Sequence, residues 1–136
     1  PQGSLGKWFM IREEKKLSND NLTFKTASLW GAQYESKTLK NDHDIVIIDT
    51  PPKIESDARP AIEAADLVLI PIGGNFTMDP DDAAYALRTW VKPKMAIPMH
   101  YNSNPLTKGT FAEFQAAMKG SPIKIIQVVE GQIISF

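Results

Sequence analysis

One short apolar stretch constrains the fold more than any other part of the sequence. Residues 45–48 read Ile-Val-Ile-Ile, and they are followed by Asp49, Thr50 and two prolines. An unbroken β-branched run of this kind is typical of a strand buried on both faces, as in the middle of a parallel sheet. The prolines end it because they cannot donate to a ladder. We therefore expect Asp49 and Thr50 at the carboxyl edge of a central strand, where open α/β sheets bind ligands.

Two further strands of the same kind are predicted at residues 67–72 and 95–99. A helix is predicted before each of them, over 56–65 and from Asp79 onward. Asp79 is a suitable cap, and the proline and two acids that follow it favour the first turn of a helix. Strands that alternate with helices in this way pair in parallel through right-handed crossovers.

The remaining segments complete an α/β prediction. Helical patterns cover residues 5–16, 29–39 and 110–120, and an alternating pattern at 22–27 predicts a strand. Two apolar segments at the end of the chain, 123–129 and 132–136, predict a hairpin. The predicted fold is a layered α/β sandwich with a mostly parallel central sheet and a C-terminal antiparallel hairpin, formed as one domain over residues 1–136.

Composition limits the classes of partner. The 136 residues carry 15 Lys and Arg against 16 Asp and Glu, a net charge of −1 that gives no general attraction to nucleic acid or anionic membranes. There is no Cys, which excludes disulfides and thiolate zinc sites and fits a cytoplasmic location. No apolar run approaches the roughly 20 residues that span a bilayer, and no signal peptide is recognisable.

Motifs in the first half resemble those of a ParA/MinD-type partition ATPase. Three segments resemble parts of that family. They are the initial Pro-Gln-Gly-Ser, the stretch 44–52 that ends in Asp-Thr-Pro-Pro, and the predicted strand at 65–71. The resemblance covers residues 1–71 and implies that Asp49, with Thr50 beside it, supports the magnesium ion of bound ATP. The sequence holds no Gly-x-x-x-x-Gly-Lys-Ser/Thr loop to cradle the phosphates, so no nucleotide is expected to bind.

Motifs in the second half resemble the C-terminal part of a metallo-β-lactamase-fold hydrolase of the UlaG-like branch. Residues 69–80 contain Pro-Ile-Gly-Gly-Asn-Phe-Thr-Met-Asp-Pro, and residues 97–102 read Ile-Pro-Met-His-Tyr-Asn. The resemblance covers residues 66–136 and implies that His100 is a ligand of the second metal, beside a loop formed by Gly73, Gly74 and Asn75. The family's His-x-His-x-Asp-His run is absent from the sequence, and many members carry a metal-bridging Asp at position 74.

The two resemblances overlap at residues 65–71, and from this overlap we predict a chimeric domain with no complete active site and no cofactor. Two alternatives remain. The first is a residual metal-dependent hydrolase that holds zinc or manganese with His100 and one of Asp49, Asp79 or His43. The second is a module that associates with itself, as a dimer or a larger oligomer, through an exposed sheet edge or apolar face.

Overall fold

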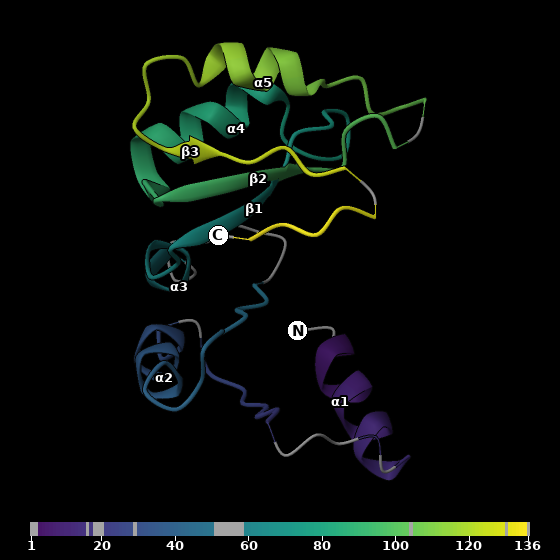
Figure 1. The fold of residues 1–136 in the computed structure, drawn as a ribbon, viewed down its shortest axis with the longest axis vertical. Coiled ribbons are helices and arrows are strands. Elements are labelled where there is room, and N and C mark those ends of the chain that lie inside the picture. The colour runs from purple at the N-terminus through teal and green to yellow at the C-terminus, as the bar shows by residue number, and fades with distance from the viewer. Residues whose placement is uncertain are drawn as a thin grey trace. The chain divides into compact units, whose positions relative to one another are not determined.

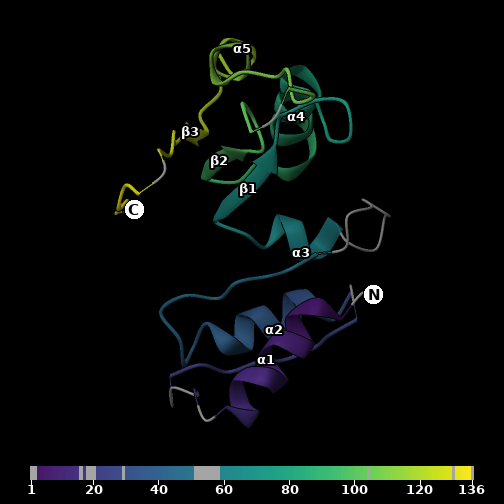
Figure 2. The same ribbon diagram turned by 90° about the vertical axis from the view of Figure 1, so that its right-hand side faces the viewer.

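The computed structural model describes residues 3–15, 17, 21–28, 30–50, 59–103, 105–129 and 131–135. The chain divides into two compact units, residues 1–64 and 65–136 (Figures 1 and 2). None of the helices in the described ranges is long and apolar enough to cross a membrane.

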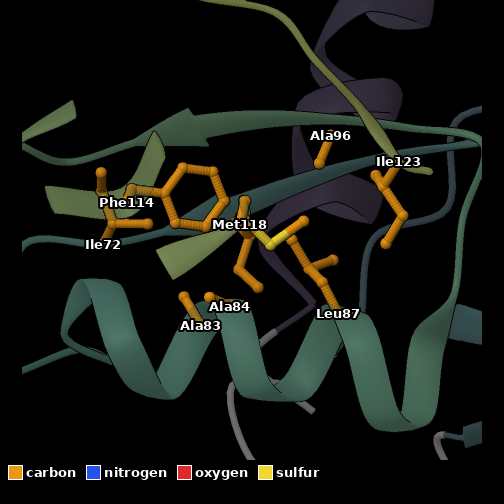
Figure 3. Packing of buried hydrophobic residues seen from close by; sticks show 9 residues of the cluster. Ile72, Ala83, Ala84, Leu87, Ala96, Phe114, Met118 and Ile123 are labelled. Carbon is orange, nitrogen blue, oxygen red and sulfur yellow. The ribbon is translucent and has the colours of Figure 1, made fainter. Parts of the chain in front are cut away.

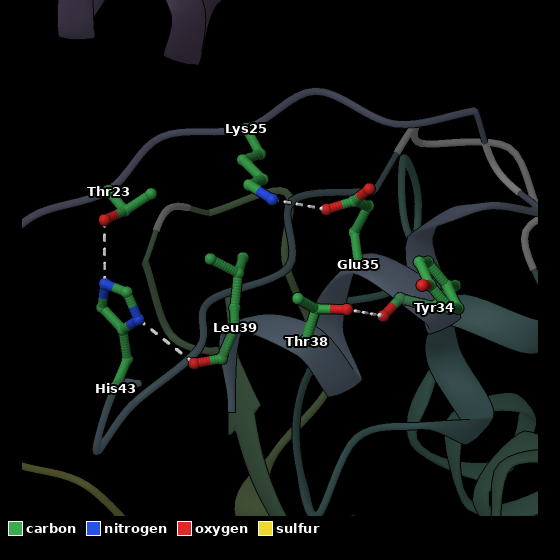
Figure 4. Close-up of polar contacts among 7 residues, drawn as sticks. All are labelled: Thr23, Lys25, Tyr34, Glu35, Thr38, Leu39 and His43. Atoms are coloured by element: carbon green, nitrogen blue, oxygen red, sulfur yellow. Dashed lines mark hydrogen bonds and ion pairs between the residues drawn. The ribbon is translucent and has the colours of Figure 1, made fainter. Parts of the chain in front are cut away.

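The first unit contains helices α1 (Ser4–Glu14), α2 (Ala32–Leu39) and α3 (Arg59–Glu63). These lie within the three helical segments that the sequence predicts for this part of the chain, apart from one residue at the start of α1. Phe9 of α1 stacks on Phe24, with 5.0 Å between the ring centroids. Lys25 pairs with Glu35 of α2 at 2.9 Å (Figure 4). The unit is therefore joined by aromatic and ionic contacts at its surface, and no residue of α1 or α2 is buried.

The predicted strands at 22–27 and 45–48 are wrong. Both segments are described, and neither forms a strand. Ile45 is 72% exposed and Ile47 is 85% exposed, so the apolar run is not covered on both faces. A β-branched run becomes a buried strand only where neighbouring strands accept its hydrogen bonds, and the described part of this unit contains none. Asp49 thus follows an unpaired segment instead of a central strand.

The second unit is built on a parallel three-stranded sheet in the order β1-β2-β3. Its strands are β1 (Leu67–Pro71), β2 (Met95–Met99) and β3 (Lys124–Ile125). Leu67 lies opposite Met95, and Met95 opposite Lys124. The α/β class and the parallel pairing predicted from the sequence are confirmed.

Helices connect these strands and begin at the predicted caps. Helix α4 (Pro80–Ala86) continues into a π-helical segment, η2 (Leu87–Val91), and α5 (Phe111–Ala117) precedes β3. The Asp79 carboxylate accepts the Asp82 N–H at 2.8 Å. At α5, the Thr110 hydroxyl accepts the Glu113 N–H at 3.2 Å, and the Glu113 carboxylate accepts the Thr110 N–H at 2.9 Å. Each pairing satisfies amide groups that a helix start would otherwise leave unbonded.

Helices α4 and α5 form a layer over one face of the sheet (Figures 1 and 2). Phe114, Leu87 and Ile72 are the largest fully buried side chains, and they lie between the helices and the strands (Figure 3). Burial of such side chains is the main favourable term in folding. The buried cluster draws all its members from this unit: Ile70, Ile72, Ala83, Ala84, Leu87, Ala96, Phe114, Met118 and Ile123.

Pro98 accounts for the short ladder between β2 and β3. The last hydrogen bond of this ladder runs from the Ile126 N–H to the Ala96 carbonyl at 3.0 Å. Alternate residues of a strand bond to the same neighbour, so the next donor toward β3 would be residue 98, and proline has no N–H. The chain forms no strand over 126–129 or 131–135. The predicted C-terminal antiparallel hairpin is therefore wrong, and β3 joins the sheet in parallel.

Candidate functional site

Three loops meet at the carboxyl edge of the sheet in the second unit. They are the loop after β1, the loop after β2, and the segment that leads into α5. Figure 1 shows them gathered at one end of the strands, on the right of the view. This is the edge at which open parallel sheets place their ligand sites.

Two glycines let these loops touch. A side chain at Gly73 would place its Cβ 2.2 Å from the His100 carbonyl oxygen and 3.0 Å from Thr107. A side chain at Gly109 would place its Cβ 1.9 Å from the Ile72 carbonyl oxygen. The Gly109 N–H also donates to the Gly73 carbonyl at 3.2 Å. The three loops are therefore in backbone contact, which holds them in a defined arrangement.

Left-handed backbone conformations are concentrated in the same loops. Gly74 has a φ of 71°, and the non-glycine residues Asn75, His100 and Asn102 have φ values of 59°, 59° and 53°. Such conformations are costly for residues with a side chain, and they gather at functional sites where the surrounding structure enforces them. Asn75 and His100 belong to the two loops that meet at Gly73.

A pocket of about 370 Å³ opens beside this contact. Its wall is formed by Gly73 and Asn75 from the loop after β1, and by Leu106 and Lys108 from the segment before α5. The volume lies within the range of roughly 300–1,000 Å³ that is usual for small-molecule sites. The site can therefore admit a small molecule against one apolar, one amide and one cationic side chain.

The described residues do not fit a metal ion by themselves. His100 follows β2 directly and is exposed, as expected for a side chain at the strand end. In the described ranges, however, no group of three or more His, Cys, Asp and Glu side chains is placed to hold a metal. A zinc site takes three or four protein ligands, and His100 supplies one.

The other candidate ligands are engaged elsewhere or lie in the first unit. His43 contacts the Leu39 carbonyl through Nδ1 at 3.1 Å and the Thr23 hydroxyl through Nε2 at 2.9 Å, so both ring nitrogens have partners (Figure 4). Asp79 caps α4. Asp49 is exposed and Thr50 is half-buried. The magnesium role of Asp49 and Thr50 stays a prediction.

An ion pair lies at the opposite end of the strands, where β1 and β2 begin. Lys94 lies just before β2, and Asp66 lies just before β1. The Lys94 ammonium donates to the Asp66 carboxylate at 2.7 Å. This hydrogen bond and the negative charge of Asp66 raise the pKa of the Lys94 ammonium. The pair joins the starts of two neighbouring strands in solvent, and it lies apart from the carboxyl-edge loops.

The structure thus brings together four of the residues singled out in the sequence: Gly73, Gly74, Asn75 and His100. Sequence reasoning missed Leu106, Lys108 and Gly109. The one local signal is the position of Gly109 directly before the capping residue Thr110, and this position does not by itself imply a close backbone contact.

Several hydrolases are similar to part of the chain. A UPF0173 metal-dependent hydrolase of Polynucleobacter asymbioticus is 82% identical over 71 residues, which cover 52% of this chain and 25% of the relative. The corresponding hydrolase of a Polaromonas species is 52% identical over 71 residues, covering 52% of this chain and 26% of the relative. The chain spans about a quarter of the length of these relatives.

A solved structure is also similar over half of the chain. It is Igni18, described as a novel metallo hydrolase from the hyperthermophilic archaeon Ignicoccus hospitalis. Its sequence is 32% identical, the match covers 52% of this chain and 30% of that chain, and the TM-score is 0.48.

These relatives correct one prediction from the sequence. The prediction of a chimeric domain without an active site is wrong, because 71 residues of the chain are 82% identical to part of a metal-dependent hydrolase. The relatives support the alternative, a metal-dependent hydrolase, and a metal cofactor is consistent with their name.

The resemblance of the first half to an ATPase family has independent support. The family model of the AAA domain matches residues 10–79, which are 70 of the 136 residues. The matched segment includes Asp49 and Thr50 and extends through β1 to the start of α4. The chain therefore belongs to the AAA domain family.

Proposed function

We propose that this chain contributes to a metal-dependent hydrolase, with its part of the active site at the carboxyl edge of β1 and β2. The single observation that carries the proposal is the contact between Gly73 and the His100 carbonyl oxygen, at which an added Cβ would lie 2.2 Å away. It joins the strand-end histidine to the loop that lines the pocket. The names of the relatives supply the reaction class.

His100 makes this contact through its backbone and carries an imidazole beside it. A neutral imidazole is a common metal ligand. His100 has a left-handed φ of 59°, a conformation that the surrounding loops must enforce. In this proposal the chain positions His100 and the substrate loops, and the described residues do not complete a metal site.

The first unit enters the proposal only through its membership of the AAA domain family. Asp49 and Thr50 lie in the matched segment. The sequence contains no Gly-x-x-x-x-Gly-Lys-Ser/Thr stretch, so the backbone cradle that binds nucleotide phosphates has no counterpart in it. We therefore base the proposed hydrolysis on the second unit.

Hydrolysis of p-nitrophenyl esters and of bis(p-nitrophenyl) phosphate tests the proposal. The protein is stripped with a chelator and assayed alone and with added zinc or manganese. We expect turnover that depends on the metal and falls by at least about tenfold in His100→Ala, since an active-site acid, base or ligand is worth this much or more. His43→Gln is the control, because His43 is held by Thr23 and Leu39 in the other unit.

Two results would overturn the proposal. One is the absence of turnover with either metal on both classes of substrate. The other is turnover that remains unchanged in His100→Ala. Circular dichroism spectra of each variant establish that a lost activity does not reflect a lost fold.

A further inference from the structure

Among the described residues that line the pocket beside Gly73, Lys108 carries the one ionisable side chain. Lys108 is exposed, and it makes no ion pair with any residue in the described ranges. The remaining lining side chains, those of Asn75 and Leu106, are neutral. The described part of the wall therefore carries a net positive charge, with no acidic side chain among its residues.

The nearby acid, Asp79, is not among the described residues that line the pocket. Asp79 follows the loop that carries Gly73 and Asn75, and its carboxylate accepts the Asp82 N–H at 2.8 Å at the start of α4. The carboxylate is directed to the helix start, where the helix dipole favours an anion. An anion that enters the pocket meets Lys108 with no carboxylate among the described lining residues to repel it.

The two sides of the pocket are fixed relative to one another. One side is the loop after β1 and the other is the segment before α5, and the hydrogen bond from Gly109 N–H to the Gly73 carbonyl joins them at 3.2 Å. Lys108 and Gly109 are adjacent in the chain, so this bond anchors the backbone of Lys108 beside Gly73. A site with a fixed backbone loses less conformational entropy when a ligand binds.

We propose that this pocket binds the anionic group of a small substrate, a carboxylate or a phosphate, with Lys108 as its cationic partner. The Asn75 amide offers a further hydrogen-bond donor, and Leu106 offers an apolar surface for the rest of the molecule. The substrate class is then a compact organic anion. The inference rests on the proposed function, since it assigns the pocket to the substrate of the hydrolase.

Anion titration followed by NMR tests the proposal on the full chain. Protein labelled with ¹⁵N is titrated with inorganic phosphate and, in a separate series, with acetate. We expect saturable shifts of the Gly73, Asn75 and Gly109 amide signals, and an apparent Kd about tenfold higher in Lys108→Gln, because charge-assisted contacts are the strong ones. Tighter binding of phosphate assigns a phosphate-bearing substrate, and tighter binding of acetate assigns a carboxylate.

Lys124→Gln is the matched control. Lys124 is also an exposed lysine of this unit, and it pairs in register with Met95, at the other end of β2. This variant should bind phosphate as the unchanged protein does. Equal affinity in Lys108→Gln, or shifts that rise without saturation, would overturn the proposal.

His100→Ala separates this inference from the proposed function. If both are correct, His100→Ala loses hydrolysis and keeps anion binding, whereas Lys108→Gln weakens anion binding and raises KM. If anion binding is present and no hydrolysis is found with either metal, the proposed function is wrong and the assignment of the pocket as an anion-binding site is retained. If hydrolysis is found without saturable anion binding, only the pocket assignment fails.

Discussion

Replacing Gly109 with alanine is the sharpest test of how the carboxyl-edge loops are held. The new Cβ would lie 1.9 Å from the Ile72 carbonyl oxygen, whereas ordinary contact begins at 3.4 Å, so the backbone would have to move by roughly 1.5 Å, the difference of the two. Its φ is not in the left-handed region, so the obstacle to alanine is steric, with Pro80 Cδ also close at 3.1 Å. The nearest obstacle is a backbone carbonyl group, which cannot rotate away as a side chain can.

The expected cost follows from two effects. The shift would break the 3.2 Å hydrogen bond between Gly109 N–H and the Gly73 carbonyl, at about 1 kcal/mol. Forcing an atom into a packed site adds about 1–3 kcal/mol. The free energy of unfolding of the second unit should therefore fall by about 2–4 kcal/mol.

Urea denaturation measures this loss in the second unit alone. Trp8 and Trp30 are changed to phenylalanine, so that fluorescence reports Trp90, the third tryptophan of the sequence, which lies in η2. Gly120→Ala is the control, because Gly120 has a φ of +79° but nothing within 4 Å of an added Cβ. It should cost about 1–2 kcal/mol from backbone strain. A loss in Gly109→Ala no larger than that in Gly120→Ala would refute the role assigned to the close backbone contact.

Three further predictions concern the second unit. Phe114→Ala should lower the free energy of unfolding by about 3–5 kcal/mol, because Phe114 is fully buried. Phe76→Ala, at an 81% exposed position, should change this free energy by less than about 0.5 kcal/mol in the same denaturation assay. Thr110→Ala removes the capping hydroxyl of α5 and should cost about 1 kcal/mol, with Thr110→Ser retaining most of the stability. Lys94→Met should lower the melting temperature at neutral pH. This difference should vanish as the pH rises through the raised pKa of Lys94, because loss of the proton ends the attraction to Asp66. A difference in melting temperature that grows with pH would contradict this prediction.

The elements that sequence reasoning placed correctly carry their signals locally. Helix α5 is marked by the reciprocal pairing of Thr110 and Glu113, and α4 by Asp79 and Pro80. Strands β1 and β2 come directly after helical segments, so the parallel pairing follows from their order along the chain. Each of these signals lies within a few residues of the element that it predicts.

The failed predictions depended on partners that the pattern does not contain. The run at 45–48 has the composition of a buried strand, but no described strand of its unit accepts its hydrogen bonds. The hairpin prediction treated the last segments as partners of one another, whereas β3 pairs with β2 instead. A strand is defined by its neighbours, and neighbours distant in sequence are not visible in a local pattern.

The candidate site was predictable to a similar extent. His100 and the loop of Gly73 and Asn75 follow strands, so their meeting at one edge could be expected from a parallel sheet. Lys108 and Gly109 follow no strand, and their place in the site depends on a contact with Ile72 and Gly73 across the intervening helix and strand. No property of the residues around Gly109 specifies that contact.

Pro98 has a consequence for the behaviour of the protein at high concentration. Open sheet edges recruit further strands from other molecules, and the recruited chain gains one hydrogen bond for each free donor or acceptor. On the side of β3, the ladder stops at Ala96, and the next position of β2 that faces this side has no donor. A strand added to β2 beyond Ala96 on this side would gain few backbone bonds, so Pro98 disfavours fibril-like growth along that part of β2.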